Sequence, residues 1–211
     1  SSDVCSSDLA VVTGALYKHD VSPQEFGVGM IDGAFPVRAA VFARTAQLPG
    51  RLYNDMASGG YLVWDDPIGD GVFIDGRLEV YDTAFITDYM TAQSSPARWP
   101  TEADRFGIQT VILSHRFENE RALMGRLVTS GAWTLVYLDE VAAIYVRTAG
   151  NVDALARAST LRPEWDAETA AWLGRPARRW PYQAGRVEGL RAYARAQADR
   201  KSTRLNSSHR T

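Results

Sequence analysis

The stretch Arg51–Arg77 constrains the fold of this chain most, because its apolar runs are short and each is bounded by turn residues. The order of these signals predicts a strand, a turn, a short helix, a second turn and a second strand. Ser58 is expected to cap the short helix at its N-terminus. The apolar run Val72–Asp75 is expected to be a buried strand. A strand, a helix and a strand in this order are typical of an α/β domain.

The rest of the chain continues this alternation. Further strands are expected at Thr110–Leu113, Trp133–Leu138 and Val141–Arg147, the last two forming a hairpin around Asp139-Glu140. The pattern predicts an α/β fold with a mainly parallel sheet of about five strands, covered by helices and closed by an antiparallel hairpin at one edge. Helices are expected from Pro36 to just before Pro49, and at Val80–Met90, Thr101–Phe106 and Phe117–Thr129.

Both ends of the chain, residues 1–9 and 199–211, resemble translated sequencing-adapter DNA. We expect these ends not to belong to the natural protein, so Cys5, the sequon at Asn206 and His209 carry no functional interpretation. Between them we expect an α/β domain at residues 10–148, which opens on a candidate strand at Ala10–Tyr17. A truncated, repeat-like helical appendage is expected at residues 149–198, with helices at Asn151–Ser159, Glu164–Leu173 and Gln183–Ala198.

The composition argues against several functional classes. The chain has 23 basic and 25 acidic residues, and without the adapter-like ends these become 19 and 22. A net charge near −3 does not suit a nucleic-acid-binding protein, whose footprint is basic. No cysteine remains for a disulfide or a thiol nucleophile, and His19 and His115 alone give little support to a histidine metal site or a Ser-His-Asp triad. We therefore expect neither a metal nor a cofactor.

Glycines and aromatic rings in the opening stretch form the first group of candidate ligand-binding residues. Gly59 and Gly60 would let a phosphate or another backbone approach the start of a helix. Tyr61 and Trp64 would stack on a sugar ring. Helix packing is the alternative role for the glycines, and a place in the core is the alternative for the rings.

Polar residues at the ends of the two expected strands form the second group. Asp75 and Arg77, on either side of Gly76, would bind sugar hydroxyls or a phosphate just past a strand end, where open α/β sheets bind ligands. A structural ion pair that fixes the turn is the alternative. Asn54 and Asp55 follow the first strand of the stretch and complete the candidate set.

Four blocks of the sequence resemble a known family of proteins. They read FGVGMIDGAFPVRAAVF, LPGRLYNDMASGGYLVW, VFIDGRLEVYD and WTLVYLDEVAAIYVR, and the resemblance covers about Phe26 to Arg147. They resemble the soluble region that follows the transmembrane helices in bacterial membrane proteins. Those proteins are similar to polyprenyl-phosphate-sugar-dependent glycosyltransferases, in the superfamily of dolichyl-phosphate-mannose-protein mannosyltransferases and oligosaccharyltransferases. The segment from Asn54 to Trp64 is similar in placement to the acceptor-binding Trp-Trp-Asp-Tyr-Gly segment of oligosaccharyltransferases, although its double tryptophan is missing here.

The resemblance implies a location and a set of partners. In that superfamily the catalytic acid lies in an early loop between membrane helices, so we expect no catalytic residue in this chain. The chain would be an extracytoplasmic, periplasmic accessory domain, and the nine candidate residues would line an edge that faces the acceptor or the membrane. Its partners would be a missing N-terminal transmembrane half of the same protein and a glycan or lipid-linked sugar, with no nucleic acid.

Two other functions remain open at this stage. The chain could be a non-catalytic protein-interaction domain whose helical segment docks a partner. It could also be a soluble hydrolase that uses Asp75 and His115, which would then have to lie within about 3 Å of each other, directly or through one water.

Overall fold

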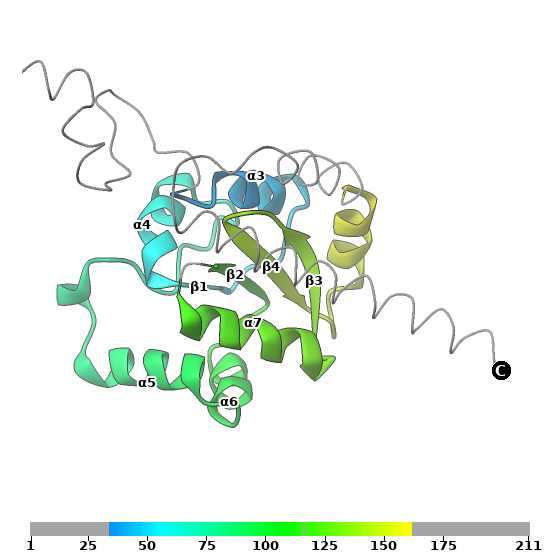
Figure 1. Ribbon diagram of the computed structural model, residues 1–211. Helices are drawn as coiled ribbons and strands as arrows, with labels where there is room; N and C mark the ends of the chain where they lie inside the picture. Colours follow the sequence, from blue (N-terminus) through cyan, green and yellow to red (C-terminus); the bar gives the residue numbers. More distant parts are fainter. Residues whose placement is uncertain (1–33, 116, 162–211) are drawn as a thin grey trace, which may run out of the picture.

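The computed structural model describes residues 34–115 and 117–161 as an α/β fold (Figure 1). The candidate strand Ala10–Tyr17 and the expected helices Glu164–Leu173 and Gln183–Ala198 lie outside the described residues. Within them, no helix is both long enough and apolar enough to span a bilayer. The elements in chain order are α3 (Val37–Thr45), β1 (Leu52–Asn54), α4 (Met56–Asp65), the 3-10 turn η1 (Leu78–Val80), α5 (Thr83–Ser94), α6 (Arg98–Arg105), β2 (Thr110–Ser114), α7 (Glu118–Ser130), β3 (Trp133–Leu138), β4 (Ala142–Arg147) and a helix at residues 152–161.

The described strands form one mixed sheet in the order β1-β2-β4-β3. β1 and β2 are parallel, whereas β4 is antiparallel to both β2 and β3. The expected mainly parallel sheet of about five strands is not confirmed: the described residues form a mixed sheet of four strands in which one neighbouring pair is parallel. The physical reason is that the second strand of the hairpin, β4, pairs with β2 and so separates β3 from the strands that share its direction.

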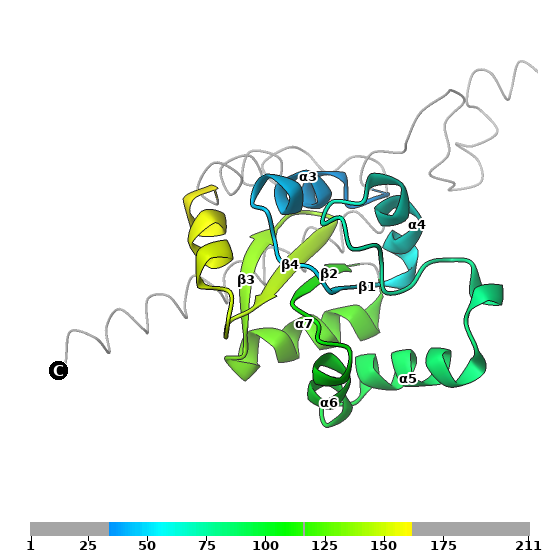
Figure 2. The same ribbon diagram turned by 180° about the vertical axis from the view of Figure 1, so that it is seen from behind.

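Helices cover both faces of this sheet (Figures 1 and 2). α3, α4 and the helix at residues 152–161 pack on one face, where Phe42, Leu62 and Ile144 belong to the same core. α5, α6 and α7 pack on the other face, where Leu123 and Tyr145 are fully buried. Residues of β2 alternate between the two cores, as the period of a strand requires. In β3 a bulge between Leu135 and Tyr137 interrupts this alternation.

The run Val72–Asp75 is not a strand, although its apolar character predicted one. Ile74 is fully buried, yet its backbone is bound by a side chain rather than by a strand ladder. The Asn54 side chain donates to the Ile74 carbonyl oxygen at 2.7 Å and accepts from the Phe73 N–H at 2.8 Å. A single amide side chain thus satisfies the backbone groups that a neighbouring strand would otherwise bind.

The short helix α4 begins earlier than its predicted cap. Ser58 lies inside the helix, and the N-cap is Asp55, whose carboxylate accepts from the Ser58 N–H at 2.9 Å. The helix ends at Asp65, and its C-cap Asp66 is in the left-handed region at φ 40°. Asp82 caps α5 in the same way as Asp55 caps α4, by accepting from the Phe85 N–H.

The hairpin around Asp139 is confirmed and has a specific internal bond pattern. The Asp139 carboxylate accepts from the Tyr137 hydroxyl at 2.6 Å and from the Val141 and Ala142 N–H groups at 2.8 Å each. Burial raises the pKa of Asp139, while these donors favour its charged form. This carboxylate therefore fixes the turn that joins β3 to β4.

The first helix of the expected appendage packs directly on the sheet domain. Ala158 is 1% exposed and belongs to the core that α3 and β4 form. Arg157 donates to the carbonyl oxygens of Ala46 and Gln47, just after α3, at 3.0 and 2.9 Å. Residues 152–161 are thus bound to the end of α3 as well as to the core.

Candidate functional site

The parallel strands β1 and β2 end side by side, and the helices that follow them lie on opposite faces of the sheet. α4 contributes Leu62 to one core, whereas α7 contributes Leu123 to the other. In open α/β sheets this arrangement leaves a crevice at the carboxyl ends of the strands, where ligands bind. Asn54 and Asp55 lie at this position, as do Gly59 near the start of α4 and the segment Val72–Arg77. We call these residues the strand-end corner.

Asp55 connects the two strand ends of the corner. It is fully buried, and its carboxylate accepts from the Ser114 N–H at 2.7 Å, beyond its two bonds to Ser58. Burial raises the pKa of Asp55, while the donors from Ser114 and Ser58 lower it. These three donors occupy both carboxylate oxygens, so Asp55 acts as a structural acceptor between β1, β2 and α4.

Backbone fills the corner where a ligand would enter. A Cβ added to Gly59 would lie 2.2 Å from the Ile74 carbonyl oxygen and 2.6 Å from Asp75 Cα. The Ser58 N–H at the start of α4 is already bound by Asp55. Gly59 therefore serves the close approach of the segment Val72–Arg77, which is the packing role rather than a phosphate cradle. Gly60 is exposed and a Cβ there would meet nothing within 4 Å.

Asp75 and Arg77 form an ion pair within the corner. The Arg77 guanidinium donates to both Asp75 oxygens, with Nε at 3.1 and 3.0 Å and Nη2 at 2.5 Å from Oδ2. The Arg77 N–H also donates to Asp75, and the Asp75 N–H donates to the Tyr81 hydroxyl. The guanidinium lowers the pKa of Asp75. Gly76 lies between the two charged residues, and its added Cβ would meet nothing within 4 Å.

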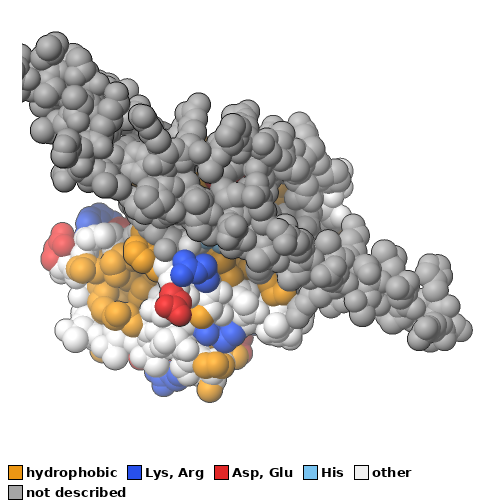
Figure 3. All heavy atoms as spheres, viewed as in Figure 1, with side chains coloured by type: hydrophobic (Ala, Val, Ile, Leu, Met, Phe, Trp, Pro, Cys, Tyr) orange, Lys and Arg blue, Asp and Glu red, His pale blue; other side chains and the backbone are white. Residues whose placement is uncertain are grey.

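The aromatic candidates Tyr61 and Trp64 lie on α4 and differ in exposure. Tyr61 is 7% exposed and stacks on Phe35 with ring centroids 5.8 Å apart. Trp64 is 74% exposed and lies beside Tyr61 at 5.7 Å. Leu78 and Val80 on the turn η1 are also at least half exposed. Figure 3 shows that hydrophobic side chains gather on one part of the described surface in this view.

A buried polar cluster beside the corner was not predicted from the sequence. Tyr53 of β1, Tyr89 of α5 and Glu120 of α7 are at most 6% exposed. Burial raises the pKa of both tyrosines, and the Glu120 carboxylate raises it further. Tyr89 accepts from the Met56 N–H at 3.1 Å and from Gln93 at 2.9 Å. Burial raises the pKa of Glu120. No local signal could find this cluster, because its members are far apart in sequence and each looks like part of an apolar strand or an amphipathic helix.

Groups suited to metal binding do not converge in the described part of the chain. No set of three or more His, Cys, Asp or Glu side chains there could hold a metal ion. The Asp75 carboxylate that the hydrolase hypothesis needs has Arg77 as its ion-pair partner. His115 follows β2, and its backbone N–H donates to the Val141 carbonyl oxygen at 2.9 Å.

Comparison with known proteins gives no relative for this chain. No family model, no curated protein and no solved structure matches it. The fold and the corner define the class: a mixed α/β domain whose strand-end crevice is filled by its own backbone.

Proposed function

We propose that this chain is a non-catalytic accessory domain that acts beside a membrane-embedded glycosyltransferase half of the same protein, on the extracytoplasmic side. The closed strand-end corner is the observation that supports this proposal most. Asp55 and Asp75, the carboxylates best placed for acid–base or nucleophilic chemistry, accept hydrogen bonds from the fold itself. The order of the four sequence blocks supplies the link to a transferase.

In this proposal the domain contributes a surface instead of a reaction centre. The candidate edge would position an acceptor glycan or a lipid-linked sugar, or support the membrane half. Trp64 has an exposed ring on α4, and it is the candidate residue best suited to stack on a sugar. The polar candidates would act indirectly, by holding the segment Val72–Arg77 in place.

The coding sequence on the amino-terminal side of Ala10 tests the proposal directly. We expect eight or more apolar spans there, roughly 20 residues each, with an acidic residue in the first outward loop. An alkaline phosphatase fusion after the domain would then be active, since that enzyme works outside the cytoplasm. A soluble domain at that position, or an inactive fusion, would contradict the proposal.

A protein-interaction domain is the second candidate, and the exposed apolar residues favour it. Trp64 and Val152 are each 74% exposed, and Val80 is 61% exposed. A contiguous exposed apolar patch marks a contact site, whereas single exposed apolar residues are common on protein surfaces, so this candidate requires these residues to contact a partner. Pull-down with the wild-type chain and with a Trp64→Ser, Val80→Ser double variant distinguishes the candidates, because only an interaction domain loses a protein partner.

A further inference from the structure

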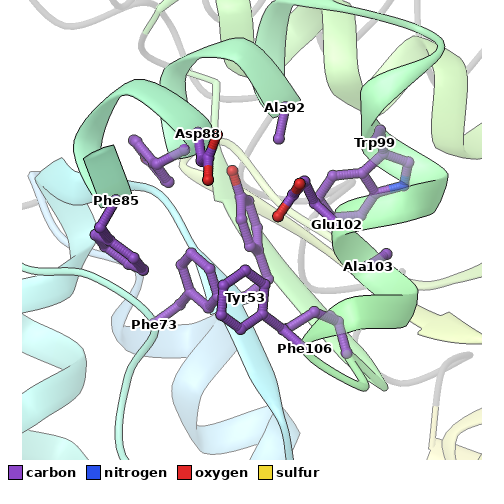
Figure 4. Close-up of a pocket in the computed structure, with 11 residues that line it drawn as sticks. Tyr53, Phe73, Phe85, Asp88, Ala92, Trp99, Glu102, Ala103 and Phe106 are labelled. Carbon is purple, nitrogen blue, oxygen red and sulfur yellow. The ribbon is translucent and has the colours of Figure 1, made fainter. Parts of the chain in front are cut away.

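Two features of the described structure have no role in the strand-end corner: an aromatic pocket and the outer face of α4. The pocket lies between α5, α6 and β1 (Figure 4) and has a volume of about 10 Å³, enough for roughly one water molecule. Arg105 already bridges the two carboxylates that line it, Asp88 and Glu102, at 3.1 and 3.2 Å. The outer face of α4, in contrast, is open to solvent.

The solvent side of α4 is apolar along almost its whole length. Val63 is 42% exposed and Trp64 is 74% exposed. Gly60, Val63 and Trp64 are three and four positions apart, so they form one stripe along the helix. A surface helix normally turns polar side chains toward water, so a contiguous apolar stripe indicates a contact site. The residues of α4 that are not buried are Met56, Ala57, Gly60, Val63, Trp64 and, at the end of the helix, Asp65.

The neighbouring helix α3 covers one flank of α4 and leaves this stripe open. Phe35, just before α3, stacks on Tyr61, and Arg44 near the end of α3 binds the Asp65 carboxylate. Figures 1 and 2 show the two helices on the same face of the sheet. The exposed stripe therefore lies on the outside of the described domain, where another molecule can reach it.

The stripe contains both a projecting group and a matching depression. The Trp64 ring projects into solvent, and a Cβ added to Gly60, about one helical turn before it, would meet nothing within 4 Å. A knob and a hole one turn apart on the same stripe are complementary to a second copy of that stripe when the two helices run antiparallel. About a two-fold axis, each Trp64 then lies over Gly60 of the other copy, so one surface satisfies itself twice.

The charges beside the two ends of α4 favour the antiparallel arrangement. Arg77 lies beside the first half of the helix, because its ion-pair partner Asp75 packs against Gly59, and its side chain is 63% exposed. Asp66 follows the last residue of the helix and is exposed. An antiparallel pair brings each Arg77 toward Asp66 of the other copy and sets opposite ends of the two helix dipoles side by side. A parallel pair would place like charges together.

We propose that two copies of this chain pair through the outer faces of α4, antiparallel and about a two-fold axis, with each Trp64 ring seated over Gly60 of the other copy. A helix of 10 residues covers less than the roughly 800 Å² that each partner contributes to a standard stable interface. The pair is therefore in equilibrium with the single chain. This inference does not rest on the proposed function. It means that a sugar reaches the Trp64 ring only in the single chain.

Sedimentation velocity of the full chain over about a hundredfold range of concentration tests the pairing. We expect a shift from one copy to two as the concentration rises. Trp64→Ala should weaken the association at least about tenfold, because it removes the central aromatic anchor. Gly60→Leu should weaken it about as strongly, because the new side chain fills the hole. Asp66→Asn should weaken it about threefold, and this loss should shrink in high salt.

Oxidative cross-linking tests the arrangement of the two copies. Val63 lies between Gly60 and Trp64 on the stripe and so close to the proposed axis, and Val63→Cys should form a disulfide between two copies. The background is Cys5→Ser, because Cys5 is the only cysteine of the chain. Val41→Cys on α3 is the matched control, since Val41 is 38% exposed against 42% for Val63. It should cross-link at least about tenfold more slowly, because its Cα atoms in the pair are too far apart for a disulfide.

Non-specific adhesion and a different occupant of the face give different results. Adhesion through exposed apolar side chains would increase in Gly60→Leu, and it would cross-link Val41→Cys as readily as Val63→Cys. A face that binds another molecule would leave the chain as a single copy at every concentration. Each of these results would overturn the proposal, and so would an association that survives both Trp64→Ala and Gly60→Leu. Melting curves of each variant establish that it is folded.

Discussion

At the residue scale, two adjacent glycines of α4 have different roles. Gly59 faces the Ile74 and Asp75 backbone at distances that no Cβ tolerates, whereas Gly60 faces open space. Gly59→Ala should therefore destabilise the protein by about 2–3 kcal/mol, because it must displace the segment Val72–Arg77. Gly60→Ala should stabilise it by about 0.5–1 kcal/mol through helix propensity. Urea unfolding of both variants measures the contrast, and equal effects would contradict it.

A second residue-scale prediction concerns the pH dependence of stability. Glu120 is 6% exposed, its Oε2 has no hydrogen-bond partner among the described residues, and burial raises its pKa above the ordinary 4.5. The folded state then holds the proton more tightly than the unfolded state. The resulting stabilisation is complete below about pH 4.5 and is lost as the pH rises through the folded pKa.

Glu120→Gln should therefore gain stability relative to the wild type as the pH rises from about 5 to 8. Asp55 also contributes less stability as the pH rises, because burial raises its pKa. Asp75 contributes more stability as the pH rises, because Arg77 lowers its pKa. Glu118→Gln is the control, since Glu118 lies in the same first turn of α7 but is exposed. Urea unfolding at both pH values measures the difference, and parallel curves for the wild type and Glu120→Gln would contradict the prediction.

At the element scale, the sequence predicts β3, β4 and the helix Phe117–Thr129 well, because local signals decide them. Trp133–Leu138 has the predicted bounds, and Gly131 ends α7 with φ 71°. The run Val72–Asp75 was misassigned because its apolar pattern is the same for a strand and for a buried loop. What decides between them is the partner of its backbone, the Asn54 side chain 20 residues away in the chain.

The candidate site was predictable only in part, for the same reason. The sequence identifies the residues of the strand-end corner, and Asp75 and Arg77 do lie together. It does not reveal that Asp55 is bound by Ser114, 59 residues further along the chain. Residue type alone therefore cannot distinguish a free carboxylate from one that holds two strand ends together.

The hairpin of β3 and β4 provides an element-scale prediction. Asp139→Ala should lower the free energy of unfolding by about 3 kcal/mol, because it leaves the Tyr137 hydroxyl and two backbone N–H groups without their acceptor. Tyr137→Phe should cost about 1–2 kcal/mol, and the double variant should cost about 1 kcal/mol less than the sum of the two. A double-mutant cycle in urea measures this coupling, and simple additivity would refute it.

At the scale of the whole molecule, the sheet departs from the parallel pattern through one strand. β1, β2 and β3 run in the same direction, and β4 alone is reversed and lies between β2 and β3. The alternation of helices and strands along the chain predicts that β1, β2 and β3 run in the same direction. It does not predict which strands are neighbours in the sheet. The order of neighbours depends on which strand lies inside the sheet. β4 lies between β2 and β3, and five of its six residues are buried.

The helix at residues 152–161 provides the prediction that belongs to the whole fold. Ala158 is 1% exposed and lies within the core of α3 and β4, whereas Ala156 on the same helix is exposed. Ala158→Asp should destabilise the complete chain by more than about 3 kcal/mol, because it buries an unpaired charge. Ala156→Asp should change stability by less than about 0.5 kcal/mol. Thermal and urea unfolding distinguish the two, since a helix that merely follows the sheet domain would tolerate both substitutions equally.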